Sequence, residues 1–376
     1  MTAPVTTPKD LPQTDDFLSL FLNDTPLLDV RAPVEFMQGA FPCSENFPLM
    51  DDRERESVGI RYKEMGQDEA IKLGHELVQG DIKAGKVDHW SAFFKQHPEG
   101  ILYCFRGGMR SKISQQWIYQ RTGKIFPRVE GGYKAMRRFL IDELEHSSQI
   151  IKPIMLGGRT GIGKTVLLKK INQQIDLEGL FHHRGSVFGK HVTPQPSQID
   201  IENKLSIELL KHRNKQHSYL VLEDEGANIG SRRIPEVLFT AMQQAPLIQL
   251  EASIDERINI TFEEYIIEAL AEHQRFYGDE AGFTKWAEQL QESIDKIQRR
   301  LGGVRHKELK ALLSHAIQQH QSNNSLQLHK DWIRVLLVDY YDPMYDYQFS
   351  KKENRVIFKG SQDDILSFLK TDYQLT

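Results

Sequence analysis

Short apolar runs alternate with amphipathic stretches along the first part of the chain. Residues 26–31, 100–104 and 151–156 are such runs, and each has the length of a buried parallel strand. The second run leads through a glycine pair to an amphipathic stretch from Ser111, and the third leads through glycines to residues 164–175. This recurring strand, glycine loop and helix predicts an α/β fold with parallel sheets and helices on their faces.

The later part of the chain has a different pattern, helical and charged from about residue 253 to 334. Residues 138–150 look like a polar helical connector. We therefore predict three parts in the 376 residues: an N-terminal domain with the cysteine loop at 1–140, a phosphate-loop domain at 141–252, and a largely helical region packed on the latter at 253–376.

Composition narrows the class of protein. A hydrophobic share of 39% suits ordinary cores. No apolar run approaches the roughly 20 residues of a membrane span, and the N-terminus lacks a signal pattern, so we expect a cytoplasmic protein without a membrane partner. The two cysteines are too few for a disulfide framework.

Net charge is −4, which does not indicate a general nucleic-acid surface. Local basic clusters are present, and a cluster of this kind is more often a solvated helix face than an RNA site. The candidate RNA contacts are Arg137, Arg138, Arg232 and Arg233.

The first candidate for chemistry is the loop from Cys104 to Arg110, which follows a predicted strand and precedes a predicted helix. A thiolate there faces backbone N–H groups and the positive end of the helix. Gly107 and Gly108 let the amides turn inward as an anion nest. Arg106 and Arg110 add positive charge, so Cys104 is a candidate nucleophile or carrier of a transferable atom.

Two other interpretations of this loop stay open. The spacing Cys-x5-Arg is also that of cysteine phosphatases, although Tyr103 stands where those enzymes have a histidine. The second interpretation is that Cys104 is a buried structural cysteine, and the surrounding glycines and arginines argue against it.

The second candidate is a phosphate loop, Gly158-x4-Gly163-Lys164-Thr165, between an apolar run and a predicted helix. Amides from Gly161 to Thr165 would cradle phosphate oxygens and Lys164 would neutralise them. Thr165 would hold Mg²⁺.

Carboxylates follow a further apolar run at residues 218–222. A metal ion at Thr165 needs such ligands at the end of a neighbouring strand. Strand geometry places Glu223 and Glu225 on one face and Asp224 on the other. We favour the two glutamates as metal ligands, and Asp224 stays an alternative. ATP, GTP and a prenyl diphosphate all present a suitable polyphosphate head.

Four segments around the cysteine loop resemble a rhodanese domain: residues 29–36 (Asp-Val-Arg-Ala-Pro-Val-Glu-Phe), 39–42 (Gly-Ala-Phe-Pro), 46–49 (Asn-Phe-Pro-Leu) and 130–133 (Glu-Gly-Gly-Tyr). Rhodaneses carry sulfur or selenium on the loop cysteine. The loop here is one residue longer than the commonest sulfurtransferase form. The resemblance implies that the first domain, residues 1–140, is rhodanese-like, with Cys104 as its functional residue.

Both loops, with residues 184–189, 194–198 and 340–345, together resemble the bacterial tRNA 2-selenouridine synthases from about residue 29 to 360. The resemblance implies a tRNA partner with 2-thiouridine at the wobble position of its anticodon loop. It implies geranylation of the sulfur by geranyl diphosphate, then displacement of that sulfur by selenium from selenophosphate. A protein that supplies selenophosphate is the second implied partner. We favour selenium carried covalently on Cys104 over direct binding of selenophosphate by the loop, and geranyl diphosphate at the phosphate loop.

Three rival functions remain. A nucleotide-dependent kinase or NTPase with a rhodanese-like regulatory domain would turn over ATP. A phosphatase would release phosphate from aryl phosphates. A non-catalytic RNA-binding protein would be indifferent to loss of the Cys104 thiol.

Overall fold

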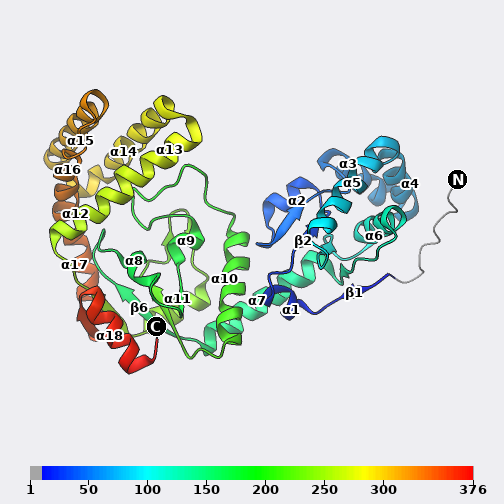
Figure 1. Cartoon of the computed structure of the whole chain (residues 1–376), viewed down its shortest axis with the longest axis horizontal. Helices are drawn as coiled ribbons and strands as arrows, with labels where there is room; N and C mark the ends of the chain where they lie inside the picture. Colours follow the sequence, from blue (N-terminus) through cyan, green and yellow to red (C-terminus); the bar gives the residue numbers. More distant parts are fainter. Residues whose placement is uncertain (1–10, 376) are drawn as a thin grey trace. The chain divides into compact units, whose positions relative to one another are not determined.

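A computed structural model describes residues 11–375, and the chain packs as two compact units (Figure 1). Unit 1 takes the chain up to residue 147 together with 197–211, and unit 2 takes 148–196 together with the residues from 212. Most of helix α10 (Gln198–Asn214) therefore belongs to unit 1 although it follows part of unit 2. The connector expected at 138–150 is the second half of helix α7 (Gly132–Ile150). The three-domain division stays a prediction.

Unit 1 is built on a parallel five-stranded sheet of order β1-β5-β4-β2-β3. Strands β2 and β4 confirm the first two predicted strands. The strands are β1 (Gln13–Thr14), β2 (Leu27–Asp29), β3 (Ser44–Asn46), β4 (Ile101–Tyr103) and β5 (Arg128–Val129). The helices other than α7 and α10 are α1 (Phe17–Leu22), α2 (Pro33–Gln38), α3 (Asp52–Met65), α4 (Gln67–Leu77), α5 (Gly80–Gln96) and α6 (Met109–Thr122).

A buried ion pair fixes the end of β2. The Nε of Arg31 donates to Asp29 Oδ2 at 2.8 Å, and its Nη2 donates to the carbonyl of Gly39 at 2.8 Å. The guanidinium also lies 3.9 Å from the ring centroid of Tyr133 at the start of α7. A buried charge persists only when it is paired and hydrogen-bonded in this way. These contacts join the carboxyl end of β2 to α7.

Unit 2 contains a second parallel sheet, of order β12-β11-β6-β8-β7. Its strands are β6 (Lys152–Gly157), β7 (Gln174–Ile175), β8 (Tyr219–Glu223), β11 (Leu247–Leu250) and β12 (Val356–Gly360). A separate antiparallel pair joins β9 (Asn228–Ile229) and β10 (Arg232–Arg233). The helices before residue 253 are α8 (Lys164–Leu168), α9 (Leu177–Phe181) and α11 (Glu236–Gln244).

The helix predicted over 164–175 is wrong in its second half. Helix α8 ends at Leu168, and Gln174 and Ile175 form strand β7 instead. Ile175 pairs with Leu222 of β8 and is buried. Burial of this side chain at the sheet edge outweighs the local helical pattern.

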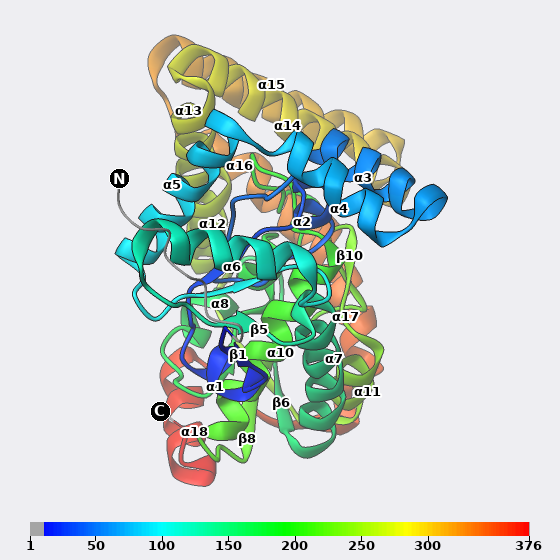
Figure 2. The ribbon, with the colours of Figure 1, turned by 90° about the vertical axis from the view of Figure 1, so that its right-hand side faces the viewer.

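The helical pattern predicted after residue 253 is confirmed. The elements are α12 (Ile254–Phe262), the π-helix η1 (Glu263–Glu268), α13 (Ala269–Tyr277), α14 (Asp279–Leu301), α15 (Gly303–Asn323), α16 (His329–Val335), the π-helix η2 (Leu336–Tyr341), α17 (Asp342–Ser350), the 3₁₀ turn η3 (Glu353–Arg355) and α18 (Gln362–Tyr373). Helices α14 and α15 lie side by side (Figures 1 and 2). Trp286 of α14 and Trp332 of α16 are buried in the apolar cluster of this region. The chain then returns to the sheet through β12, a strand that the sequence did not predict. None of the described helices is long and apolar enough to cross a membrane.

Candidate functional site

The cysteine loop begins where β4 ends. Cys104 follows Tyr103 at the carboxyl edge of the unit 1 sheet and is buried. Its thiol donates to Ser111 Oγ at 3.2 Å. Helix α6 begins at Met109, two residues before the predicted start, so its amino end faces the loop. This is the strand, loop and helix arrangement expected from the sequence.

The turn at Gly132 packs closely against the backbone of the cysteine loop. The φ angle of Gly132 is +59°, and a Cβ there would lie 2.2 Å from the carbonyl oxygen of Cys104 and 2.4 Å from the nitrogen of Gly107. The next residue, Tyr133, donates its N–H to the same Cys104 carbonyl at 2.8 Å. Gly107 also has a positive φ of +65°. The close approach of the two segments therefore requires glycine.

Arg110 is held by a carboxylate. Its Nη1 and Nη2 donate to the two oxygens of Glu35 at 2.5 and 3.1 Å. Burial alone would raise the pKa of the Glu35 carboxyl, but the hydrogen bond and charge of Arg110, with the Ala32 N–H and Arg55, together lower it. Arg106 is exposed and borders the same cavity as Cys104. Gly108 is exposed beside it, at the start of α6.

Sequence reasoning missed two residues at this loop. Glu35 fixes Arg110, and Arg128 of β5 donates from Nη1 to the carbonyl of Gly107 at 2.5 Å. Glu35 stands in the segment that resembles rhodanese, which was the only available signal. No sequence pattern pointed to Arg128, because its place beside the loop follows from the order of strands in the sheet and not from spacing along the chain.

The phosphate loop lies between β6 and α8, as predicted. Gly161 and Gly163 have positive φ angles of +71° and +83°. A Cβ on Gly161 would lie 2.1 Å from Thr261 Oγ1 of α12, so this glycine is sterically required. Lys164 is half-buried, and its ammonium lies 3.5 Å from the carbonyl of Gly158.

The carboxylates after β8 lie beside this loop because β8 pairs with β6. Thr165 Oγ1 donates to Glu223 Oε1 at 2.8 Å, and Glu223 is fully buried. Asp224 instead forms an ion pair of 2.8 Å with Lys352. The structure therefore brings Thr165 and Glu223 together and gives Asp224 another partner.

Glu178 of α9 is a further carboxylate here that the sequence did not single out. Its Oε2 lies 3.5 Å from Thr165 Oγ1, and its N–H donates to Glu223 at 3.3 Å. Burial and the neighbouring Glu225 raise the pKa of Glu178 to about 8. Burial raises the pKa of Glu225 to about 7 despite the attraction of Lys164. Glu178 lies within an apolar stretch without a recognisable motif, so no pattern marked it.

The cluster has more carboxylates than nearby cations. Burial and Glu178 raise the pKa of Glu223 to about 7. Burial alone would lower the pKa of Lys164, but the charges of Glu225, Glu178 and the other nearby carboxylates together raise it. Buried carboxylates held this close need protons or a cation. Their oxygens and the Thr165 hydroxyl are hard donors that suit Mg²⁺.

The four arginines considered for RNA have protein partners. Arg137 is half-buried and bonds to Glu202 and Asn203 within unit 1. Arg232 donates to the carbonyl of Pro196 at 2.7 Å. Two are exposed and lie in ion pairs on their own element or next to it: Arg138 with Asp142, and Arg233 with Glu236. Exposed pairs of this kind are weak and open readily to a phosphate.

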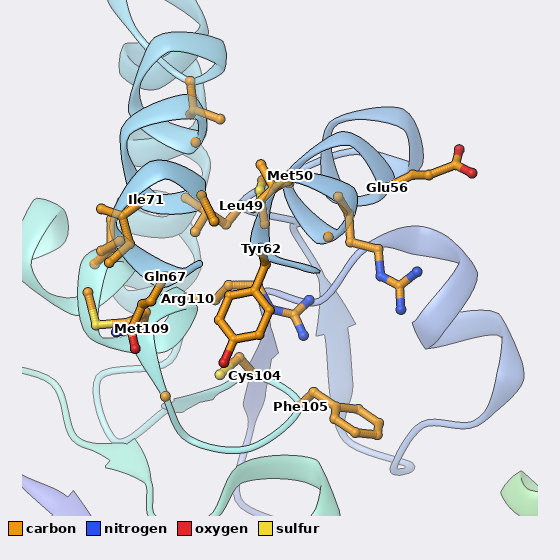
Figure 3. Close-up of a pocket in the computed structure, with 18 of the residues that line it drawn as sticks. Leu49, Met50, Glu56, Tyr62, Gln67, Ile71, Cys104, Phe105, Met109 and Arg110 are labelled. Carbon is orange, nitrogen blue, oxygen red and sulfur yellow. The ribbon is translucent and has the colours of Figure 1, made fainter. Parts of the chain in front are cut away.

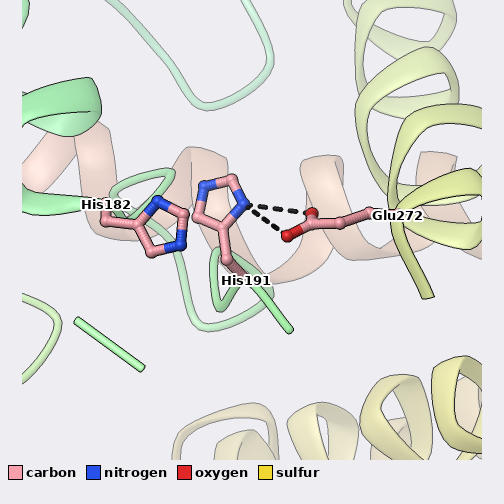
Figure 4. A group of neighbouring side chains, drawn as sticks. All are labelled: His182, His191 and Glu272. Carbon is pink, nitrogen blue, oxygen red and sulfur yellow. Dashed lines mark hydrogen bonds and ion pairs between the residues drawn. The ribbon is translucent and has the colours of Figure 1, made fainter. Parts of the chain in front are cut away.

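A histidine cluster in unit 2 offers a second set of metal-type donors (Figure 4). One ligand atom each from His182, His191 and Glu272 lies within 4.8 Å of the others. His191 Nδ1 lies 3.0 Å from Glu272, and Arg184 donates to the same carboxylate at 3.2 Å. A cation at this cluster would compete with the Arg184 guanidinium for Glu272.

These features define a class: an α/β protein with a phosphate loop and its carboxylates in one unit and a glycine-cradled cysteine in the other. A family model described as the tRNA 2-selenouridine synthase AAA domain matches residues 151–375. Curated relatives with the name tRNA 2-selenouridine synthase match nearly the whole chain. That of Marinobacter nauticus is 50% identical, covering 96% of this chain and 98% of its own length. That of Sulfurovum sp. is 48% identical (96% and 99%), and that of Bordetella petrii is 47% identical (95% and 96%).

The chain therefore belongs to the tRNA 2-selenouridine synthase family, a family of enzymes. One solved structure, an N-terminal domain from Clostridium difficile 630, is 30% identical over 31% of this chain and 89% of its own. Its TM-score of 0.28 is too low to indicate a shared fold.

Proposed function

We propose that this enzyme converts 2-thiouridine at the wobble position of tRNA into 2-selenouridine by two successive displacements. The observation that carries the proposal is the presence, in a member of this family, of a phosphate loop with buried carboxylates and of a buried cysteine in a glycine loop bordered by Arg106 and Arg110. Unit 1 is proposed to be a rhodanese-like domain that handles selenium. Unit 2 is proposed to handle the diphosphate.

The first displacement alkylates the sulfur at the phosphate loop. The sulfur of the base attacks the first carbon of geranyl diphosphate, the carbon–oxygen bond breaks, and diphosphate leaves. Amides from Gly161 to Thr165 and the ammonium of Lys164 would bind the departing charge. Thr165, Glu223 and Glu225 would hold Mg²⁺, which supplies further neutralisation of a leaving diphosphate. The proton that the base loses passes to water.

The second displacement takes place at the cysteine loop. Selenium supplied as selenophosphate attacks C2 of the base, the carbon–sulfur bond breaks, and geranylthiol leaves after taking up a proton. Water then splits the phosphorus–selenium bond and phosphate is released. The amides of Gly107 and Gly108, with Arg106 and Arg110, would hold the selenium donor. The sequence favours selenium bonded to the Cys104 sulfur. That form would need a two-electron oxidant, because selenium in selenophosphate is already at the selenide level, so the displacement written here uses selenophosphate directly, and Cys104 lines its site. Intact-mass measurement after exposure to selenophosphate, with and without an oxidant, tests the bonded form.

The tRNA partner must present an unstacked anticodon base to each centre. Arg138 and Arg233 are exposed and are proposed to exchange their carboxylates for phosphates. Arg137 and Arg232 are also proposed as contacts, although each would first have to leave its protein partner. A protein that makes selenophosphate is the proposed supplier of the second substrate.

Mass spectrometry of nucleosides tests the proposal. Thiolated tRNA is incubated with the wild-type protein and with both, one or neither of geranyl diphosphate and selenophosphate. We expect S-geranyl-2-thiouridine with the first alone and 2-selenouridine only with both. Unchanged nucleosides together with ATP turnover would favour the NTPase, and phosphate release from an aryl phosphate would favour the phosphatase.

A further inference from the structure

A cavity of about 980 Å³ lies beside Cys104 within unit 1 (Figure 3). Its walls come from α3, α4, the start of α6 and the segment that precedes α3. The apolar part of its lining includes Leu49, Met50, Val58, Ile71, Ile113 and Trp117. Cavities that bind organic ligands have volumes of roughly 300–1,000 Å³. The space is therefore large enough for a substantial hydrocarbon group.

Helix α3 lines this cavity and contacts the core through the partly buried Val58. It has no buried residue over its 14 positions. Three of its apolar side chains, Val58, Ile60 and Tyr62, line the cavity. Ile60 and Tyr62 are 50% and 57% exposed. Apolar side chains gathered along one accessible wall mark a binding surface.

The opposite end of the cavity is polar. Cys104, Arg106, Gly108 and Arg110 line it. Figure 3 shows Cys104 and Arg110 together at this end, with the α3 residue Tyr62 beside them. A small anion such as selenophosphate needs this end only, because hydrocarbon walls give a charged group no stabilisation. The cavity as a whole suits a ligand with a polar end and a hydrocarbon body.

We infer that this cavity binds a short prenyl chain whose polar end lies at the Cys104 loop. The inference rests on the proposed function, in which the chain is carried first by geranyl diphosphate and then by the sulfur of the base. In the second displacement the chain is attached to the sulfur that leaves the attacked carbon. It must therefore extend from the loop into the neighbouring space, where apolar walls remove it from water.

The test compares leaving groups that differ only in their hydrocarbon. Anticodon stem-loop RNAs carry S-geranyl- or S-methyl-2-thiouridine, and 2-selenouridine formation from selenophosphate is followed by mass spectrometry. For Val58→Glu and Ile60→Glu we expect kcat/KM to fall by about tenfold or more with the geranyl RNA and by less than about twofold with the methyl RNA. Ile82→Glu is the matched control, because Ile82 is 53% exposed on α5 and lies outside this lining. It should leave both rates unchanged.

A second arm identifies the carrier of the chain. The same variants are assayed for geranylation of 2-thiouridine RNA by geranyl diphosphate. A loss in selenation of the geranyl RNA assigns the cavity to the thioether, and a loss confined to geranylation assigns it to the diphosphate; both support a prenyl site. Equal losses with geranyl and methyl RNA, or no loss in either arm, overturn the inference. If the wild-type protein forms no 2-selenouridine from geranyl RNA, the proposed function itself is overturned.

Discussion

Thr165 Oγ1 and Glu223 Oε1 lie 2.8 Å apart in a hydrogen bond between the phosphate loop and the end of β8. This bond joins residues 58 positions apart. It sets the hydroxyl and the carboxylate as neighbouring oxygens, which is what a shared Mg²⁺ ion requires.

Replacing Thr165 tests this relationship. Thr165→Val keeps the shape but removes the hydroxyl, so we expect geranylation to slow by about 10- to 100-fold. Selenation of RNA that is already geranylated should continue. Thr284→Val is the control, because Thr284 is exposed on α14 and bonds only to a backbone carbonyl of its own helix. A variant with undiminished, Mg²⁺-dependent geranylation would contradict the assignment.

Stability should depend on pH through the buried carboxylates. The pKa of Glu178 is raised to about 8 and that of Glu223 to about 7, from an ordinary 4.5. The folded protein therefore binds more protons than the unfolded chain between about pH 4.5 and 8, and without metal its stability should fall as pH rises through this range. Melting in chelator should show a lower Tm at about pH 8 than at about pH 6.

The Glu178→Gln variant should flatten this dependence. Added Mg²⁺ should raise the Tm of the wild-type protein most at the alkaline end, where the carboxylates are ionised. A metal-free Tm that is constant or rises with pH over the same range would show that these carboxylates are ionised throughout.

The pair of Arg110 with Glu35 should matter for stability as well as for chemistry. Arg110→Ala leaves the buried Glu35 carboxylate with only the Ala32 N–H and a longer pair with Arg55 at 3.7 Å, so we expect a cost of up to about 3 kcal/mol. Glu35→Ala combined with Arg110→Ala should recover part of this loss. Arg121→Ala removes an exposed pair with Asp88 and should cost less than about 1 kcal/mol. Urea unfolding measures the free energy of unfolding of all three variants. Equal losses for Arg110→Ala and Arg121→Ala would contradict burial as the cause.

Gly132→Ala should disable the cysteine loop alone. A Cβ there would meet Cys104 O at 2.2 Å, so the loop must shift. Gly123→Ala is a close control, because its φ is +68° but a Cβ would meet nothing within 4 Å. We expect selenation to be lost only in the first variant, with geranylation unchanged in both. Equal selenation rates would show that the loop tolerates displacement.

The sequence predicted those parts of the molecule that depend on local spacing. Both glycine loops, and the strands that lead into them, lie where the pattern indicated, because glycine conformation and strand length are local properties. Glu178 and Arg128 were missed because sheet order brings them to the loops from other parts of the chain. Ile175 was wrongly assigned to a helix for the same reason, since its pairing with β8 is a tertiary contact.

The cavity beside Cys104 was anticipated only in part. Residues 51–63 are rich in charge, a pattern that is typical of a solvated insertion and is also compatible with the border of a substrate cleft. The structure places most of them in α3, an exposed helix that lines the cavity. The apolar residues of α3 are too few to predict that this helix lines a cavity. The helix has no buried face, so these residues do not recur with a helical period.

The central claim is that the two units perform successive steps on one base, and nucleoside mass spectrometry of two variants tests it most directly. Thiolated tRNA is supplied with geranyl diphosphate and selenophosphate. Cys104→Ser should accumulate S-geranyl-2-thiouridine, whereas Lys164→Ala should form none and should still convert pre-geranylated tRNA to 2-selenouridine. Loss of the same step in both variants, or full activity in either, would contradict this division.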